Sequence, residues 1–264
     1  MFFRKLRNYP WRAAVVVLLV FSTVEVYAQI NESDTSKYEI KIGINGIVQK
    51  GNVDLIILRS RVEWMADLGK NFVVKSQSNT LYQSFSGWKA DQDLNSRNFL
   101  YYSPRERLYP FAMAFVQTNF RRKLGFRYFS GLGVSYSIVQ RENMYVKVSG
   151  SMVREESRFD AQKYSEPWYD GADQIRIWRP TSYVAVGLGG RDQKIHFHGS
   201  ASWQPGLDPV SNQRFQGEAT VEIKVAKGFA LTLQYLYSYE GVVPLSVQKS
   251  DSIFSFGGNY RIRK

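Results

Sequence analysis

Residues 215–225 read FQGEATVEIKV, where every odd position is apolar or small and every even position is polar. Successive side chains of a β-strand point to opposite faces, so a strand would place all of these polar residues on one face. A helix would scatter the same charges around its surface. The stretch therefore predicts a β-strand with one apolar and one polar face.

The same period of two recurs along the chain, most clearly at 38–49, 194–204 and 229–239. From this pattern and the turn residues between the segments we predict twelve strands. They lie near 38–49, 53–66, 71–84, 95–103, 110–121, 125–139, 143–155, 174–188, 193–204, 214–225, 228–239 and 252–263. The predicted fold class is all-β.

The predicted connections differ in length in a regular way. Longer connections are expected at 85–94, 156–173, 205–213 and 240–251, and each follows an odd-numbered strand. Outer-membrane barrels have short periplasmic turns and longer external loops, whereas a β-sandwich has no such asymmetry. The pattern predicts a transmembrane antiparallel β-barrel of about twelve strands with both termini in the periplasm. We expect the loop at 156–173, with Trp168 and Tyr169, to act as a plug or an external binding loop.

The first residues have the pattern of a secretory signal. Arg4, Lys5, Arg7 and Arg12 precede the apolar run 13–21, and Ala28 supplies a small residue for cleavage. A membrane anchor is the alternative, but it would need about 20 apolar residues. We expect a signal peptide at 1–28, a loose periplasmic lead-in at 29–37 and a barrel at 38–264, located in the outer membrane of a Gram-negative bacterium.

Composition excludes several classes of protein. The chain has no cysteine, which excludes a disulfide-stapled domain and a thiolate metal site. The formal net charge is +12, but the basic residues are spread over the chain and the export signal removes access to nucleic acid, so we expect no nucleic-acid partner. Aromatic residues make up 15% of the chain, which suits rings placed at a bilayer interface.

The cost of burying charge in lipid indicates which face is which. Lipid-facing residues of a barrel must be apolar, while the lumen tolerates polar groups. The predicted lumen-facing polar residues are Arg59, Arg61, Lys75, His196, His198, Glu218, Glu222 and Lys224. Because both signs of charge occur, we expect a mixed and partly paired polar network rather than an ion selector of one sign.

His198 and Ser200 are the only candidates for catalysis. They lie two apart on a predicted strand, so they share a face, and a His-activated Ser is a common nucleophile. The spacing resembles the His-x-Ser of the outer-membrane phospholipase A family, but the alternation here places the pair in the lumen, away from lipid. His196 and His198 could also share a metal, yet the pattern is not specific, and we predict no metal site and no cofactor.

The segment from residue 46 to about residue 159 resembles a known family. The resemblance is carried by Gly51-Asn52, by NFLYY at 98–102 and by GLGVSY at 131–136. The family is that of the salt-induced outer-membrane proteins, the domain of unknown function 481. The resemblance implies an outer-membrane barrel without a known enzymatic site, and it carries no functional residues over to this chain.

Three functions remain open from the sequence. The first is a non-enzymatic outer-membrane barrel, either a narrow porin-like pore for a small solute or a structural, stress-linked envelope protein. The second is a phospholipase-like lipid-modifying enzyme using His198 and Ser200, and the third is a soluble periplasmic barrel or sandwich that binds an apolar ligand. The expected partners are outer-membrane lipid, lipopolysaccharide at the basic residues 121–123, and the outer-membrane insertion machinery.

Overall fold

The computed structural model describes residues 30–33, 36–50, 54–141, 143–189, 194–207 and 212–263. The predicted signal peptide lies outside the described residues. The described part forms twelve strands: β1 (Tyr38–Gln49), β2 (Leu55–Gly69), β3 (Phe72–Phe85), β4 (Trp88–Tyr102), β5 (Leu108–Asn119), β6 (Leu124–Arg141), β7 (Met144–Phe159), β8 (Gln174–Gly189), β9 (Ile195–Gln204), β10 (Arg214–Ala226), β11 (Phe229–Glu240) and β12 (Ser250–Arg263).

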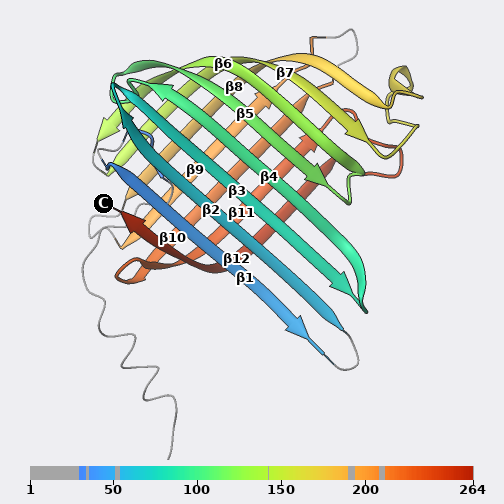
Figure 1. Ribbon diagram of the computed structural model, residues 1–264, viewed down its shortest axis with the longest axis horizontal. Coiled ribbons are helices and arrows are strands. Elements are labelled where there is room, and N and C mark those ends of the chain that lie inside the picture. Colours follow the sequence, from blue (N-terminus) through green and yellow to red (C-terminus); the bar gives the residue numbers. More distant parts are fainter. Residues whose placement is uncertain are drawn as a thin grey trace, which may run out of the picture.

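The strands close into one antiparallel barrel. Each strand pairs with its neighbours in the chain, and β12 pairs back to β1. Closure leaves no unpaired sheet edge, and the strands run diagonally across the view in Figure 1. The predicted closed all-β barrel of twelve strands is therefore confirmed, and a sandwich is excluded.

The barrel has two distinct ends. We call the end where β1 starts and β12 finishes the terminal end; it lies at the left in Figure 1, by the label C. The opposite end, which we call the loop end, carries the connections after the odd-numbered strands. The only helix among the described residues is a short 3₁₀ turn, Pro167–Tyr169, in the loop between β7 and β8. No helix in the described part of the chain has the length and apolar character needed to cross a bilayer.

The prediction of a loop at 85–94 is wrong. β3 continues to Phe85 and β4 begins at Trp88, so only Ser86 and Gly87 join them. Both have positive φ, 48° and 81°, which is the geometry of a two-residue turn matched to strand twist. Residues 89–93 are largely polar and therefore resemble a loop in the sequence. Several of them line the barrel's interior or its rim, so the start of β4 could not be recognised there.

The barrel is apolar outside and mostly polar inside. The buried set contains many charged and polar side chains, among them Glu63, Arg127, Arg179 and Glu222, while most large apolar strand residues on the other face are exposed. On β1, for example, Glu39 and Lys41 are buried, whereas the alternating residues Ile40 and Ile42 are exposed. This is the reverse of a water-soluble domain, whose apolar side chains face inward.

Candidate functional site in the barrel lumen

Inward-facing side chains from opposite walls meet across the lumen. Arg61 on β2 donates to Glu218 on β10 (3.0 Å) and to Glu63 on its own strand (2.6 Å). Lys41 on β1 forms an ion pair with Glu222 on β10. β2 and β10 are not neighbours in the sheet, so these bonds span the interior rather than follow its wall.

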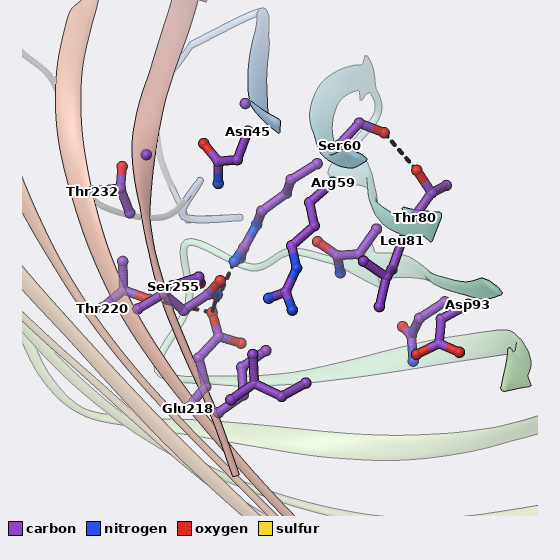
Figure 2. Close-up of a pocket in the computed structure, with 18 of the residues that line it drawn as sticks. Asn45, Arg59, Ser60, Thr80, Leu81, Asp93, Glu218, Thr220, Thr232 and Ser255 are labelled. Atoms are coloured by element: carbon purple, nitrogen blue, oxygen red, sulfur yellow. Dashed lines mark hydrogen bonds and ion pairs between the residues drawn. The ribbon is translucent and has the colours of Figure 1, made fainter. Parts of the chain in front are cut away.

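A cavity of about 240 Å³ extends from this network toward the loop end. It is lined by Asn45, Arg59, Asp93, Glu218 and Thr220, among others (Figure 2). Figure 2 shows Arg59 extending from β2 into the open space. Arg59 has no hydrogen bond or ion pair with any residue in the described part of the chain, in contrast to Arg61. We call this space the main cavity.

The structure places the other predicted lumen residues as follows. Lys75 on β3 is buried and pairs with Glu32, and His196 on β9 is buried near the terminal end. Lys224 is half-buried between exposed Ile223 and Val225. The predicted residues Arg59, Arg61, His198, Glu218 and Glu222 all line the main cavity, so these five come together there.

His198 is held by a tyrosine and not by Ser200. The Tyr145 hydroxyl and His198 Nδ1 are 2.7 Å apart, and His198 is 1% exposed. Its Nε2 has no hydrogen-bond partner among the described residues, so no His–Ser pair is formed. Gly187 makes room for Tyr145, since a Cβ at Gly187 would lie 2.1 Å from the tyrosine ring.

No group of three or more metal-binding side chains occurs among the residues that the structure describes. The interior offers charged pairs and hydroxyls instead.

A second space, which we call the aromatic chamber, lies beside the first. It has a volume of about 110 Å³ and borders Arg97, as the main cavity does. One wall carries aromatic and thioether side chains from β4, β5 and β6, namely Phe99, Tyr101, Phe111, Met113, Phe115 and Phe129. The lining also carries hydroxyls from β6 to β9, namely Ser135, Ser149, Ser151, Thr181, Tyr183 and Ser202. No pattern in the sequence indicates this chamber.

Residues 30–33, which we call the N-terminal segment, close the aromatic chamber at the terminal end. Ile30 is 1% exposed, and Ser33 Oγ donates to the Pro104 carbonyl at 2.6 Å. Glu32 receives hydrogen bonds from Lys147 (2.9 Å) and the Tyr109 hydroxyl (2.9 Å). The loose lead-in expected here is therefore wrong for these residues, because their apolar and acidic side chains find partners inside the barrel.

The Glu32 carboxyl is ionised throughout the neutral range. Burial alone would raise its pKa, but the charges of Lys147 and Lys75 outweigh burial and hold the pKa well below its ordinary value. A carboxyl whose pKa is lowered on folding contributes stability above its unfolded pKa and loses it as the pH falls toward the folded pKa. Docking of the N-terminal segment should therefore persist at neutral pH and weaken only in strong acid.

A buried ionic cluster lies inside the barrel toward the loop end. Arg127 donates hydrogen bonds from its two terminal guanidinium nitrogens to Glu240 (2.8 and 2.9 Å), and Arg179 donates to Glu155 at 2.6 Å. Arg214 also pairs with Glu155. Removing such charges from water costs free energy, and close pairing of donors with acceptors offsets that cost.

The basic residues 121–123 do not form one patch. Arg122 is buried and pairs with Asp251 at 2.6 Å, whereas Arg121 is exposed and pairs with Asp91. The expected cluster at 121–123 is therefore wrong in this respect, because the turn between β5 and β6 directs Arg122 inward, toward Glu240 of β11 and Asp251 of β12.

The loop between β7 and β8 folds over the loop end. Tyr164 packs with Leu124, Phe159, Ile175 and Val242 in one apolar cluster. Tyr169 packs against this cluster, while Trp168 is 73% exposed. Trp168 is therefore available at the outer surface, and Tyr169 helps to fix the loop.

Comparisons with known proteins give one family match and several structural matches. A family model described as "Protein of unknown function, DUF481" matches residues 42–262. Among solved structures, the NanC porin is 9% identical with a TM-score of 0.49, covering 84% of this chain and 98% of that chain. The translocator domain of the autotransporter NalP from Neisseria meningitidis is 11% identical with a TM-score of 0.42, covering 89% and 91%.

The Pseudomonas putida toluene transporter TodX is 10% identical with a TM-score of 0.39, covering 93% of this chain and 89% of that chain. No curated protein matches the chain. The description of the fold rests on the strand pairing of this chain itself.

Proposed function

The chain belongs to the DUF481 family, and we propose that it spans the outer membrane of a Gram-negative bacterium as a narrow channel for small polar solutes. The observation that carries this proposal is a closed barrel with an apolar exterior around a polar cavity. Lipid requires every backbone polar group to be paired internally, and a closed barrel meets that requirement.

The exterior supports a membrane-spanning role. Phe72 and Tyr102 are exposed side by side near the terminal end, with ring centroids 5.1 Å apart, and Tyr82 is exposed nearer the loop end. At about 3.3 Å per residue, Phe72 and Tyr82 are about 33 Å apart along β3. A tilt of about 40° reduces this to about 25 Å, the height of the apolar band between the aromatic girdles of outer-membrane barrels.

Lipopolysaccharide is the proposed partner outside. Arg154, Arg158 and Arg176 lie on the exterior toward the loop end, and Arg154 stacks over exposed Trp178 with 5.6 Å to the ring. Guanidinium groups pair well with phosphate. With the loop end outside the cell, these groups would meet lipid A phosphates, and assembly would require the outer-membrane insertion machinery.

Single-channel recording of the refolded protein in a planar bilayer tests the channel. We expect discrete current steps, reduced by half or more in Ser255→Trp, because Ser255 lines the main cavity. Ser252→Trp is the matched control on β12, since Ser252 is exposed on the opposite face and its substitution should leave the steps unchanged. A flat trace from folded protein would contradict the channel.

A structural envelope role is the second candidate. It is favoured by the N-terminal segment at one end of the lumen and the Arg–Glu cluster at the other, which together restrict passage. Absence of current together with loss of envelope resistance to detergent in a deletion strain would support this role over the channel.

We also propose that the protein is not an enzyme. This is supported by His198, which is buried in the lumen and bonded to Tyr145 rather than turned toward lipid. We expect no phospholipid hydrolysis by purified protein. Hydrolysis that disappeared in Ser200→Ala would contradict this proposal.

A further inference from the structure

We propose that the aromatic chamber is a binding site for a small amphipathic organic acid, a carboxylate joined to an aromatic or short aliphatic body, and that the chain's own N-terminal segment occupies its carboxylate end. The inference rests on the proposed passage of small solutes through this lumen. It adds a class of ligand and an internal competitor for that ligand.

The carboxylate end of the site is built by three strands. Lys75 from β3, Tyr109 from β5 and Lys147 from β7 converge on Glu32, with Lys75 Nζ 3.4 Å from Glu32 Oε2 and the other two donors 2.9 Å from Oε1. Glu32 is the only carboxylate within ion-pair distance of either lysine in the described part of the chain. Two buried ammonium groups and a hydroxyl thus make a site for one carboxylate, positioned by the barrel wall rather than by the segment itself.

The apolar end of the site adjoins the carboxylate end. Ile30 packs among Met65, Tyr101, Phe111 and their neighbours in the apolar cluster of the lumen. The chamber continues from there toward Phe115 and Phe129. Its volume is about 110 Å³ with Ile30 in place, and engineered cavities of roughly 150 Å³ hold benzene. Withdrawal of Ile30, which lines the chamber, would add the space that a ring or short chain needs, and the hydroxyls of the lining can hydrogen-bond polar substituents on it.

The N-terminal segment is held in a way that allows exchange. Among the described residues, 30–33 form no backbone hydrogen bond with any strand, and their contacts with the wall are made by side chains. An apolar side chain two residues from a carboxylate has the same chemistry as the proposed ligand. The segment therefore competes with the ligand for the lysines, and a ligand of matching charge has to displace Glu32.

Titration calorimetry of the full mature chain folded in detergent tests the inference, with phenylacetate as the probe and neutral phenylacetamide as its counterpart. Removing the competitor in the Ile30→Ala/Glu32→Ala variant should tighten phenylacetate binding at least tenfold. Adding Lys147→Met to that variant should weaken binding at least tenfold, because half of the ammonium pair is lost. Phenylacetamide should bind weakly to every variant.

Two further variants keep the test decisive. Glu32→Gln preserves the shape of the segment and removes its charge, so it should tighten binding by a smaller factor even if the double variant folds poorly. Glu166→Ala removes a carboxylate of the outer loop and should change nothing. Folding of each variant is checked by heat-modifiable gel mobility.

The outcomes separate this inference from the proposed channel. A folded double variant that does not bind phenylacetate, or binds it equally well with and without Lys147, overturns the inference. If the same protein carries current, the channel stands without the site. Phenylacetate binding that follows the predicted order in a barrel that carries no current supports the site and overturns the channel.

Discussion

Arg59 differs from Lys41 and Arg61, which also line the main cavity, because no acidic side chain neutralises it. Lys41 and Arg61 are paired with Glu222 and Glu218, so their charges are largely cancelled. Arg59 projects into the open space without an ion pair in the described part of the chain. A fixed charge in a narrow, low-dielectric space acts strongly on ions that pass it.

Reversing this charge should change ion selectivity. Arg59→Glu is expected to shift the reversal potential in a salt gradient toward cation selectivity, without breaking an ion pair. Arg107→Glu is the matched control, since Arg107 is exposed in the turn between β4 and β5, outside both cavities. Equal shifts in the two variants would show that Arg59 does not face the conducting path.

Glu155 and Glu156 are adjacent residues with opposite environments. Glu155 is 1% exposed and pairs with buried Arg179 and Arg214, whereas Glu156 is on the outer face with Arg176. Removing one partner of a buried ion pair costs about 3–5 kcal/mol, while an exposed pair contributes about 0–1 kcal/mol.

Glu155→Ala should therefore lower the free energy of unfolding by about 3 kcal/mol or more, as measured by urea unfolding in lipid vesicles. Glu156→Ala should lower it by about 1 kcal/mol or less. Similar losses in both variants would contradict the assignment of Glu155 to the interior cluster.

At this scale the sequence could predict the face of a residue but not its partner. Alternation indicated that Arg61 and Glu218 lie on polar faces of their strands, since the period of a strand is two. It could not show that they meet, because contact across a barrel depends on the register of every strand between them. The pairing of Glu32 with Lys75 and Lys147 could not be predicted either, since Glu32 belongs to no strand and the two lysines lie on β3 and β7.

At the scale of elements, the turn between β3 and β4 shows what local sequence can hide. Ser86 and Gly87 have the positive φ values of a tight hairpin, and Gly87 in particular adopts φ 81°. Most residues avoid this region because their Cβ atom clashes with the backbone. The Ser-Gly pair was available in the sequence, but the polar residues after it resemble a loop.

Gly87→Ala should lower the free energy of unfolding by about 1 kcal/mol, because alanine must adopt the left-handed region. Gly150→Ala is the matched control, since Gly150 lies mid-strand on the outer face with negative φ and open space around its Cβ position. Urea unfolding of the two variants side by side is the measurement. A loss in Gly150→Ala as large as that in Gly87→Ala would argue against the turn geometry.

Alternation was hardest to interpret on β3 and β4. Ser76, Ser78 and Thr80 lie on the face shared with exposed Phe72 and Tyr82, and they bond to polar residues on adjacent strands. Polar residues thus occur on both faces of this stretch. The strands with a clean pattern, such as β10, were located within a residue or two, whereas β4 was predicted to start seven residues late.

At the scale of the whole molecule, strand number and closure could be predicted, but the contents of the lumen could not. The count followed from repeated alternation and turn residues, which are local signals. The N-terminal segment and the aromatic chamber depend on which walls face each other after closure. Such contacts produce no periodic pattern of residues in the sequence.

The central claim is that the barrel crosses the outer membrane with its loop end outside the cell. The absence of native cysteine allows a direct test with single introduced thiols. Trp168 is 73% exposed in the loop between β7 and β8, and Leu68 is 62% exposed near the turn between β2 and β3 at the terminal end.

A polymer-linked maleimide too large for the lumen should be applied to intact cells expressing Trp168→Cys or Leu68→Cys. We predict that Trp168→Cys is labelled on intact cells and that Leu68→Cys is labelled only after the outer membrane is permeabilised. Labelling of Leu68→Cys on intact cells while Trp168→Cys remains protected, or protection of both until permeabilisation, would contradict the account.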